Sequence, residues 1–103
     1  MTETIVVEEE SGGKKGDGGK LMYDLMYYPF LDRLVSVLTF GAKKYEPHNW
    51  KKVSRNRYEA AMMRHLTAYL QGEKKDHETG ISHLAHVTCT AMFLDYFDDQ
   101  SKN

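Results

Sequence analysis

The stretch "RHLTAYLQGEKKDHETGISHLAH", residues 64–86, holds four of the five histidines of the chain and lies between two apolar segments. Its polar centre, "EKKDHETG", is eight residues long, with a glycine just before it and another at its end. A connection of this length makes the helices on either side antiparallel neighbours. The stretch therefore predicts a helical hairpin whose titratable groups gather where the chain reverses.

The two helices of this hairpin are expected at residues 57–71 and 81–97. Apolar residues recur at helical spacing in the first, and Gly72 is placed to end it. The second has no Asp, Glu, Lys or Arg between residues 81 and 94. A helix that is apolar on all sides is normally buried on all sides. It therefore belongs at the centre of a bundle, or is shared with another subunit.

A further helix is expected at residues 29–41. Pro29 suits the first turn of a helix, and the apolar residues of 31–38 follow at helical spacing. Gly41 is a plausible end, because glycine accepts the left-handed conformation in which many helices stop. Residues 42–56 contain a proline and an asparagine that break regular patterns, so they are expected to form a loop or short turns.

The first residues of the chain have a different character. Residues 1–19 are expected to form a flexible, glycine-rich arm, followed by a helical domain at residues 20–103. Within the arm, "TIVVEEE" (residues 4–10) can form a short strand if another segment pairs with it, whereas "SGGKKGDGGK" (residues 11–20) is too rich in glycine for regular structure. The predicted fold class is all-α, a small bundle of three or four helices completed by oligomerisation.

The composition limits the function further. At 103 residues the chain is the size of one domain, and its 14 basic and 15 acidic residues nearly cancel. There is thus no global field to attract nucleic acid. The single cysteine, Cys89, excludes an intrachain disulfide and favours the reducing cytoplasm. We see no signal peptide and no apolar run long enough to span a membrane, so neither a membrane nor nucleic acid is an expected partner.

Three histidines are expected to converge. His83 and His86 in "HLAH" are spaced i, i+3 and lie on one helix face. In an antiparallel hairpin, His65 on the other helix lies at a similar depth. Either the three imidazoles share a metal ion, or they are hydrogen-bonded members of the core. A zincin protease is a poor fit, because Leu84 and Ala85 leave no general base between the histidines.

Acidic and basic side chains surround this predicted cluster. The loop above it carries Glu73, Asp76 and Glu78, which can serve a metal ion or a water molecule. Arg64, beside His65, needs an anionic partner. That partner is either a loop carboxylate, such as Glu73 or Asp76, or a phosphate group of a ligand.

The stretch "FGAKKYEPHNW", residues 40–50, alternates aromatic and basic side chains. Tyr45 and Trp50 can sandwich a base while Lys43 and Lys44 meet phosphates, and Asn49 can read a base edge. The alternative is that the two aromatic rings cap the small core and the lysines form a solvated loop.

The stretch "GDGGKLMYD", residues 16–24, is a weak candidate for a phosphate-binding turn that would include Lys20, because glycine-rich turns expose backbone N–H groups. It lacks the GxxxxGK[ST] pattern of a P-loop, and a flexible linker is the alternative.

Three motifs, "GDGGKLMYDL" (16–25), "LTFGAKKYEPHNW" (38–50) and the stretch at 64–86, resemble in order and spacing the phage and bacterial dATP/dGTP diphosphohydrolase family, which is grouped with the MazG-like pyrophosphohydrolases. The resemblance implies a helical, oligomeric phage or bacterial protein. It also implies a purine deoxynucleoside triphosphate as substrate, a divalent metal ion, and cleavage to the monophosphate and pyrophosphate.

The chain departs from the MazG-like metal motif. Those enzymes hold Mg²⁺ with ExxE on one helix and ExxD on the next. This chain has no ExxE, and its ExxD (residues 73–76) lies in the expected loop. On the following helix, "HLAH" stands where the second carboxylate pair would be expected. The metal, Mg²⁺, Mn²⁺ or a transition metal, is therefore expected on His65, Glu73, Asp76, His83 and His86, with Glu73, Asp76 and His65 as catalytic residues. The substrate-binding residues are expected to be Lys20, Lys43, Lys44, Tyr45, Asn49, Trp50 and Arg64. The missing ExxE favours an alternative function, a phage protein that sequesters a nucleotide, for example an immune signal, without hydrolysis.

Overall fold

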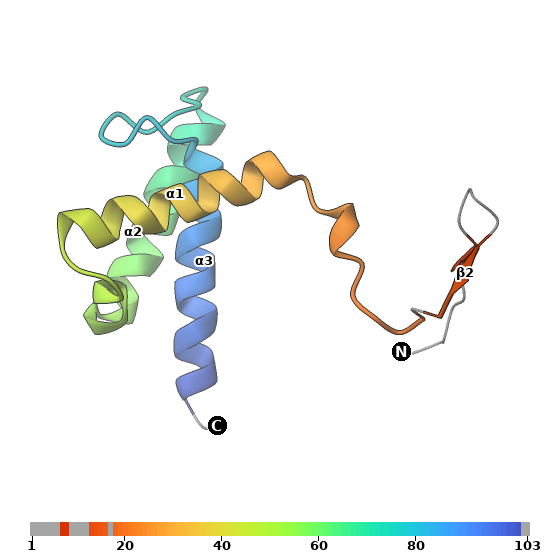
Figure 1. Ribbon diagram of the computed structural model, residues 1–103. Coiled ribbons are helices and arrows are strands. Elements are labelled where there is room, and N and C mark those ends of the chain that lie inside the picture. The colour runs from red at the N-terminus through yellow and green to blue at the C-terminus, as the bar shows by residue number, and fades with distance from the viewer. Residues whose placement is uncertain (1–6, 9–12, 17, 102–103) are drawn as a thin grey trace.

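The protein is described here by a computed structural model that covers residues 7–8, 13–16 and 18–101. Three long helices form a small bundle, which confirms the all-α prediction (Figure 1). In chain order the elements are β1 (Val7–Glu8), β2 (Lys14–Lys15), the 3-10 turn η1 (Tyr23–Leu25), α1 (Tyr28–Lys44), the 3-10 turn η2 (Asn49–Lys52), α2 (Arg55–Leu70) and α3 (His83–Gln100). None of the helices in these ranges is long and apolar enough to cross a membrane.

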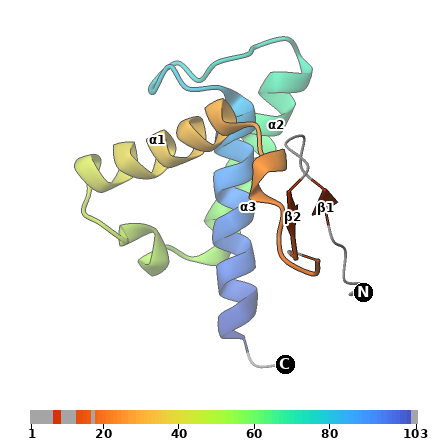
Figure 2. The same cartoon turned by 45° about the vertical axis from the view of Figure 1, so that its right-hand side comes forward.

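Helix α3 is the centre of the bundle. It packs along α2 and is crossed near its N-terminal end by α1, as the two views show (Figures 1 and 2). Among the described residues, the buried side chains all belong to α3: His83, Ala85, His86, Cys89, Thr90 and Phe93. The apolar composition of this helix therefore predicted its position correctly. Its outer side is nevertheless open in the single chain, since Leu84 and Met92 are 38% and 37% exposed.

Cys89 lies in the middle of this core. It is 1% exposed, and burial raises the pKa of its thiol to about 12. A thiol that stays protonated and shielded from solvent is chemically inert and acts as a small apolar group. The cysteine is a packing residue of the bundle, as its apolar sequence context suggests.

Helix α1 is longer than predicted. It starts with Pro29 in its first turn, as expected, but continues through Gly41 to Lys44. The prediction that Gly41 ends the helix was wrong, because glycine permits a helix end without requiring one. Helix α1 stops shortly before Pro47, which cannot continue a helix. The positive charges of Lys43 and Lys44 in its last turn stabilise the negative end of the helix dipole. The predicted loop at 42–56 accordingly contains the end of α1, the turn η2 and the start of α2.

The N-terminal segment holds a short ladder. Val7 pairs with Lys15 and Glu8 with Lys14 in an antiparallel arrangement. A strand within "TIVVEEE" was predicted on the condition that something pairs with it, but the prediction that residues 11–20 lack regular structure was wrong at Lys14–Lys15. Most of the predicted flexible arm lies outside the described residues. Figure 1 shows the segment before α1 leading away from the three helices.

The first prediction concerns the core. Phe93 is 8% exposed and stacks on Trp50 with ring centroids 4.3 Å apart. Phe93→Ala should lower the free energy of unfolding by about 3–5 kcal/mol, because it removes buried area and leaves a cavity. Phe93→Leu is the matched control and should cost less, because leucine keeps an apolar side chain in most of the same space. Urea denaturation measures both, and equal losses for the two variants would contradict this account of the core.

Candidate functional site

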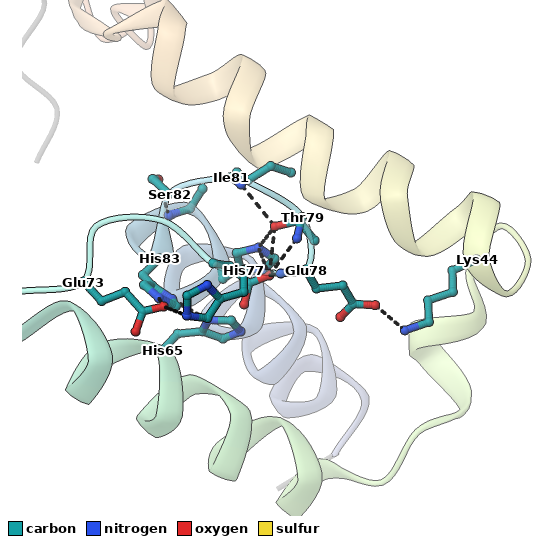
Figure 3. A network of polar contacts seen from close by, with 12 residues as sticks. Lys44, His65, Glu73, His77, Glu78, Thr79, Ile81, Ser82 and His83 are labelled. Carbon is teal, nitrogen blue, oxygen red and sulfur yellow. Dashed lines mark hydrogen bonds and ion pairs between the residues drawn. The ribbon is translucent and has the colours of Figure 1, made fainter.

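His65 of α2 and His83 of α3 meet where the two helices pack together (Figure 3), and His86 of α3 lies against His65. The Nδ1 atoms of His65 and His83 are 2.9 Å apart, and the ring of His65 stacks on that of His86 with centroids at 4.4 Å and planes 8° apart. The convergence expected from their matched depth in an antiparallel hairpin is confirmed. His83 and His86 are buried and His65 is half-buried, so the cluster sits at the edge of the core.

The loop between α2 and α3 forms a tight hairpin above the cluster. Lys75 pairs with Ser82, and the backbone N–H of Asp76 donates to the carbonyl of Ile81 at 2.9 Å. Gly72 and Gly80 have φ of +104° and +72°, values that side-chain-bearing residues rarely adopt. The glycines at the two ends of "EKKDHETG" therefore turn the chain so that its acidic residues return to the histidines.

Asp76 is held in place by three hydrogen bonds. Its Oδ2 accepts from the backbone N–H of Glu78 and Thr79 and from the hydroxyl of Thr79, at 3.0 to 3.1 Å. Partial burial opposes ionisation, but the hydrogen bonds from Thr79 outweigh it, and the pKa of this carboxyl lies below its usual value. Asp76 is thus a fixed carboxylate facing the imidazoles.

Thr79 is a residue that sequence reasoning missed. Its Oγ1 lies 2.8 Å from His86 Nε2 and also accepts the N–H of Ile81. The hydroxyl therefore connects His86 to Asp76, whose Oδ2 lies 3.9 Å from the same imidazole nitrogen. Asp76 and Thr79 are three residues apart and precede a glycine, a pattern that is typical of a turn capped by a side chain. This pattern could have identified Thr79 from the sequence.

The environment keeps His65 neutral. Burial, with the neighbouring His86 as a smaller cause, lowers its pKa to about 4. Burial also lowers the pKa of His86, against the opposing effect of Asp76. Neutral imidazoles are the form that binds metal ions or accepts protons. At neutral pH the rings of His65 and His86 are therefore uncharged.

His83 and Glu73 contact each other on the side of the cluster that faces away from the cavity. His83 Nε2 lies 3.3 Å from Glu73 Oε2, but the alignment is not that of a hydrogen bond, and in the described part of the chain this buried nitrogen has no hydrogen-bond partner. Glu73 also lies 3.0 Å from the exposed His77. Glu73 therefore lies beside His83 and does not face the cavity.

A cavity of about 930 Å³ opens beside the cluster, between the end of α1, η2, α2 and the loop. Its histidine end is formed by His65, Asp76, Thr79 and His86. Of the predicted substrate-binding residues, Lys44, Tyr45, Asn49, Trp50 and Arg64 line it, whereas Lys20 and Lys43 do not. Arg57 lines it too and was not predicted. One hollow thus joins the imidazole–carboxylate cluster to a set of cationic and aromatic side chains.

The structure distinguishes between the two roles that the sequence allowed for Trp50 and Tyr45. Trp50 stacks on Phe93 and meets the ring of Tyr96 edge-on at 4.9 Å, so it caps the core. Tyr45 remains 64% exposed at the cavity and is the better candidate to contact a base. For Arg64, neither Glu73 nor Asp76 is an ion-pair partner within the ranges described.

Lys44 does have a protein partner. Its Nζ lies 2.6 Å from Glu78 Oε2, and the pair spans the space between the end of α1 and the loop (Figure 3). The hydrogen bond that Lys44 donates to this carboxylate raises the pKa of its ammonium group. Both side chains are exposed, so the pair is weakly held and a stronger anion can replace Glu78.

Comparison with known proteins places the chain in a family. The family model described as "dATP/dGTP diphosphohydrolase, N-terminal" matches residues 10–103. The chain belongs to this family. It is 33% identical over 82 residues to a protein of Salmonella phage PMBT28 named dATP/dGTP diphosphohydrolase, and this match covers 80% of the chain. The chain spans only 28% of the length of that relative. No solved structure matches.

The second prediction follows from the lowered pKa values. The pKa of His65 falls from 6.5 in the unfolded chain to about 4 in the folded one, so on acidification the unfolded state takes up this proton first. In chelator-treated protein the free energy of unfolding should therefore decrease as the pH falls from about 6.5 to 4, and His86 adds to the same trend.

Urea denaturation across this pH range measures the effect. His65→Gln removes the titrating group and should flatten the profile, whereas His77→Gln, at a fully exposed position outside the cluster, should not. Identical profiles for the wild type and His65→Gln would show that His65 is not held neutral by the fold.

Proposed function

We propose that this chain carries the active site of a metal-dependent hydrolase that cleaves a purine deoxynucleoside triphosphate, dATP or dGTP, to the monophosphate and pyrophosphate. Membership of the family and the name of the phage relative support the substrate class. The observation that carries the proposal is the single cavity that has a fixed carboxylate and neutral imidazoles at one end and cations along its walls.

The cavity suits a nucleotide in size and charge. About 930 Å³ is within the range of small-molecule sites. Arg57 and Arg64 on α2 and Lys44 at the end of α1 would offset the charge of the phosphates, because guanidinium and ammonium groups pair well with phosphate oxygens. Tyr45 and Asn49 would contact the base at the other end. A bound triphosphate would thus have its phosphates directed towards the histidine cluster.

A divalent ion held near His65, Asp76 and His83 would polarise a phosphoryl oxygen and acidify a bound water. The buried and unpartnered His83 Nε2 and the fixed carboxylate of Asp76 are consistent with such a site. Glu78 would be freed when Lys44 turns to a phosphate, and it could then accept the proton of the attacking water. Glu73 was expected to be catalytic; its place behind His83 instead suits orientation of that imidazole.

One observation favours the second candidate, a protein that binds a nucleotide without cutting it. The Oδ2 of Asp76 already accepts three hydrogen bonds, which leaves it a weak base. In that case the cavity would retain an intact nucleotide, such as a signalling molecule.

The third prediction separates these functions. With Mg²⁺ or Mn²⁺, the protein should release pyrophosphate from dATP or dGTP, and Arg64→Ala should weaken nucleotide binding by about tenfold or more, since charged hydrogen bonds contribute about 1.5–3 kcal/mol. Arg55→Ala is the control, because this arginine of the same helix pairs with Asp98 and does not line the cavity. Absence of pyrophosphate, with intact nucleotide recovered after heat release, would support sequestration and contradict hydrolysis.

We also propose that the chain functions as a homo-oligomer, a dimer or a tetramer. Leu21, Tyr23 and Leu25, ahead of α1, are each more than 70% exposed, and α3 is partly open. A second copy of the chain would cover this unusually apolar surface.

The fourth prediction tests the assembly. Sedimentation equilibrium should give a mass of two or four chains, and Leu21→Asp with Leu25→Asp should shift the protein towards the monomer, because charge in an apolar interface is costly. Lys20→Asp, beside the same segment, is the control for added negative charge. A wild-type monomer at micromolar concentration would contradict the proposal.

A further inference from the structure

We infer that His65, His83 and Asp76 form a site for a first-row transition-metal ion, such as Mn²⁺, Fe²⁺, Co²⁺ or Zn²⁺, bound through the two Nδ1 atoms and a carboxylate oxygen in preference to Mg²⁺. This goes beyond the proposed function, which requires only some divalent ion near the cavity. It also stands without hydrolysis, since metal binding can be measured on its own.

The distances suit a shared ion. Two nitrogens bound to one ion at about 2.0–2.1 Å and at right angles lie about 3 Å apart. The two Nδ1 atoms are 2.9 Å apart. One ligand atom from each of His65, Asp76 and His83 falls within 4.8 Å of the others, close to the roughly 4.2 Å that separates ligands on opposite sides of an ion. A small inward movement of Asp76 completes the set.

The surroundings of the two ring nitrogens of His83 support the same site. When its Nδ1 binds a metal ion, the remaining proton of the neutral ring is on Nε2, which faces Glu73 Oε2 at 3.3 Å. That buried Nε2 lacks a hydrogen-bond partner among the residues described, and a slight rotation of the ring would let it donate to Glu73. A carboxylate behind a ligating histidine is a common arrangement in metal sites, where it fixes the ring and strengthens the ligand.

Each of the three ligands has a support of its own. His65 stacks flat against His86, Asp76 is fixed by Thr79, and His83 is backed by Glu73. His86, which was expected to be a ligand, is engaged by Thr79 through Nε2 and supports the ring of His65. A site whose ligands are largely held before the metal arrives, with only a small movement of Asp76 left to make, binds more tightly, because less conformational freedom is lost on binding.

The donor set decides the class of metal. Mg²⁺ prefers six oxygen ligands in an octahedron and keeps several waters. Imidazole nitrogens favour the transition metals from manganese to zinc. With two nitrogens and one carboxylate oxygen, this cluster differs from the all-carboxylate sites that suit Mg²⁺, and it carries one negative charge to set against the ion.

The experiment measures metal without nucleotide. The untagged full chain, purified without chelators, should contain about one transition-metal ion per chain by elemental analysis. After removal of that ion, Co²⁺ should bind in the same ratio, give a visible absorption band from nitrogen and oxygen ligands, and resist a large excess of Mg²⁺. Traces far below one ion per chain, or displacement by Mg²⁺, would overturn the inference, and neither readout depends on a variant folding.

Variants then locate the ion. His65→Gln and His83→Gln should lose the cobalt spectrum while helix content by circular dichroism is kept, and Glu73→Gln should keep the stoichiometry but weaken binding by about 10- to 100-fold. His77→Gln is the control, since His77 also touches Glu73 but is fully exposed. Full cobalt binding by His83→Gln would overturn the assignment.

Metal binding without pyrophosphate release would contradict only the proposed hydrolase activity. Hydrolysis with Mg²⁺ by a protein whose histidine cluster holds no metal would contradict only this inference.

Discussion

The contact between His65 and His83 is the constraint on which the rest of the site depends. Two imidazole nitrogens 2.9 Å apart at the edge of the core can share one proton or one metal ion, but they cannot both be charged without strong repulsion. The contact joins the last turns of α2 to the first turn of α3. Of the loop carboxylates, Asp76 faces these imidazoles, whereas Glu73 lies behind His83 and Glu78 pairs with Lys44.

The hairpin of α2 and α3 was predictable because few physical choices were open to it. The charge-free run from residue 81 to 94 could only be a buried helix, and the eight-residue connection left only an antiparallel neighbour. Once the two helices were antiparallel, the depths of His65, His83 and His86 followed from the helical rise. The likeness of the three motifs to the dATP/dGTP diphosphohydrolases predicted the family.

The parts that sequence could not predict depend on tertiary contacts. Thr79 is an ordinary turn residue until His86 is placed beside it. Glu73 and Asp76 share one motif, yet the hairpin turns one to the back of His83 and the other towards the cavity. Trp50 was a candidate to hold a base as well as to cap the core, and its stacking on Phe93 of α3 shows that it caps the core. Gly41 was compatible with a helix end as well as a helix interior.

The central claim is that one cavity joins a metal-binding cluster to a nucleotide site. A crystal structure with a non-hydrolysable dATP analogue, recorded at the absorption edges of the transition metals, tests it most directly. The account predicts an anomalous peak about 2 Å from Nδ1 of both His65 and His83, with the phosphates between that peak and Arg64. A nucleotide bound elsewhere, or two histidines joined by a proton with no metal peak between them, would contradict it.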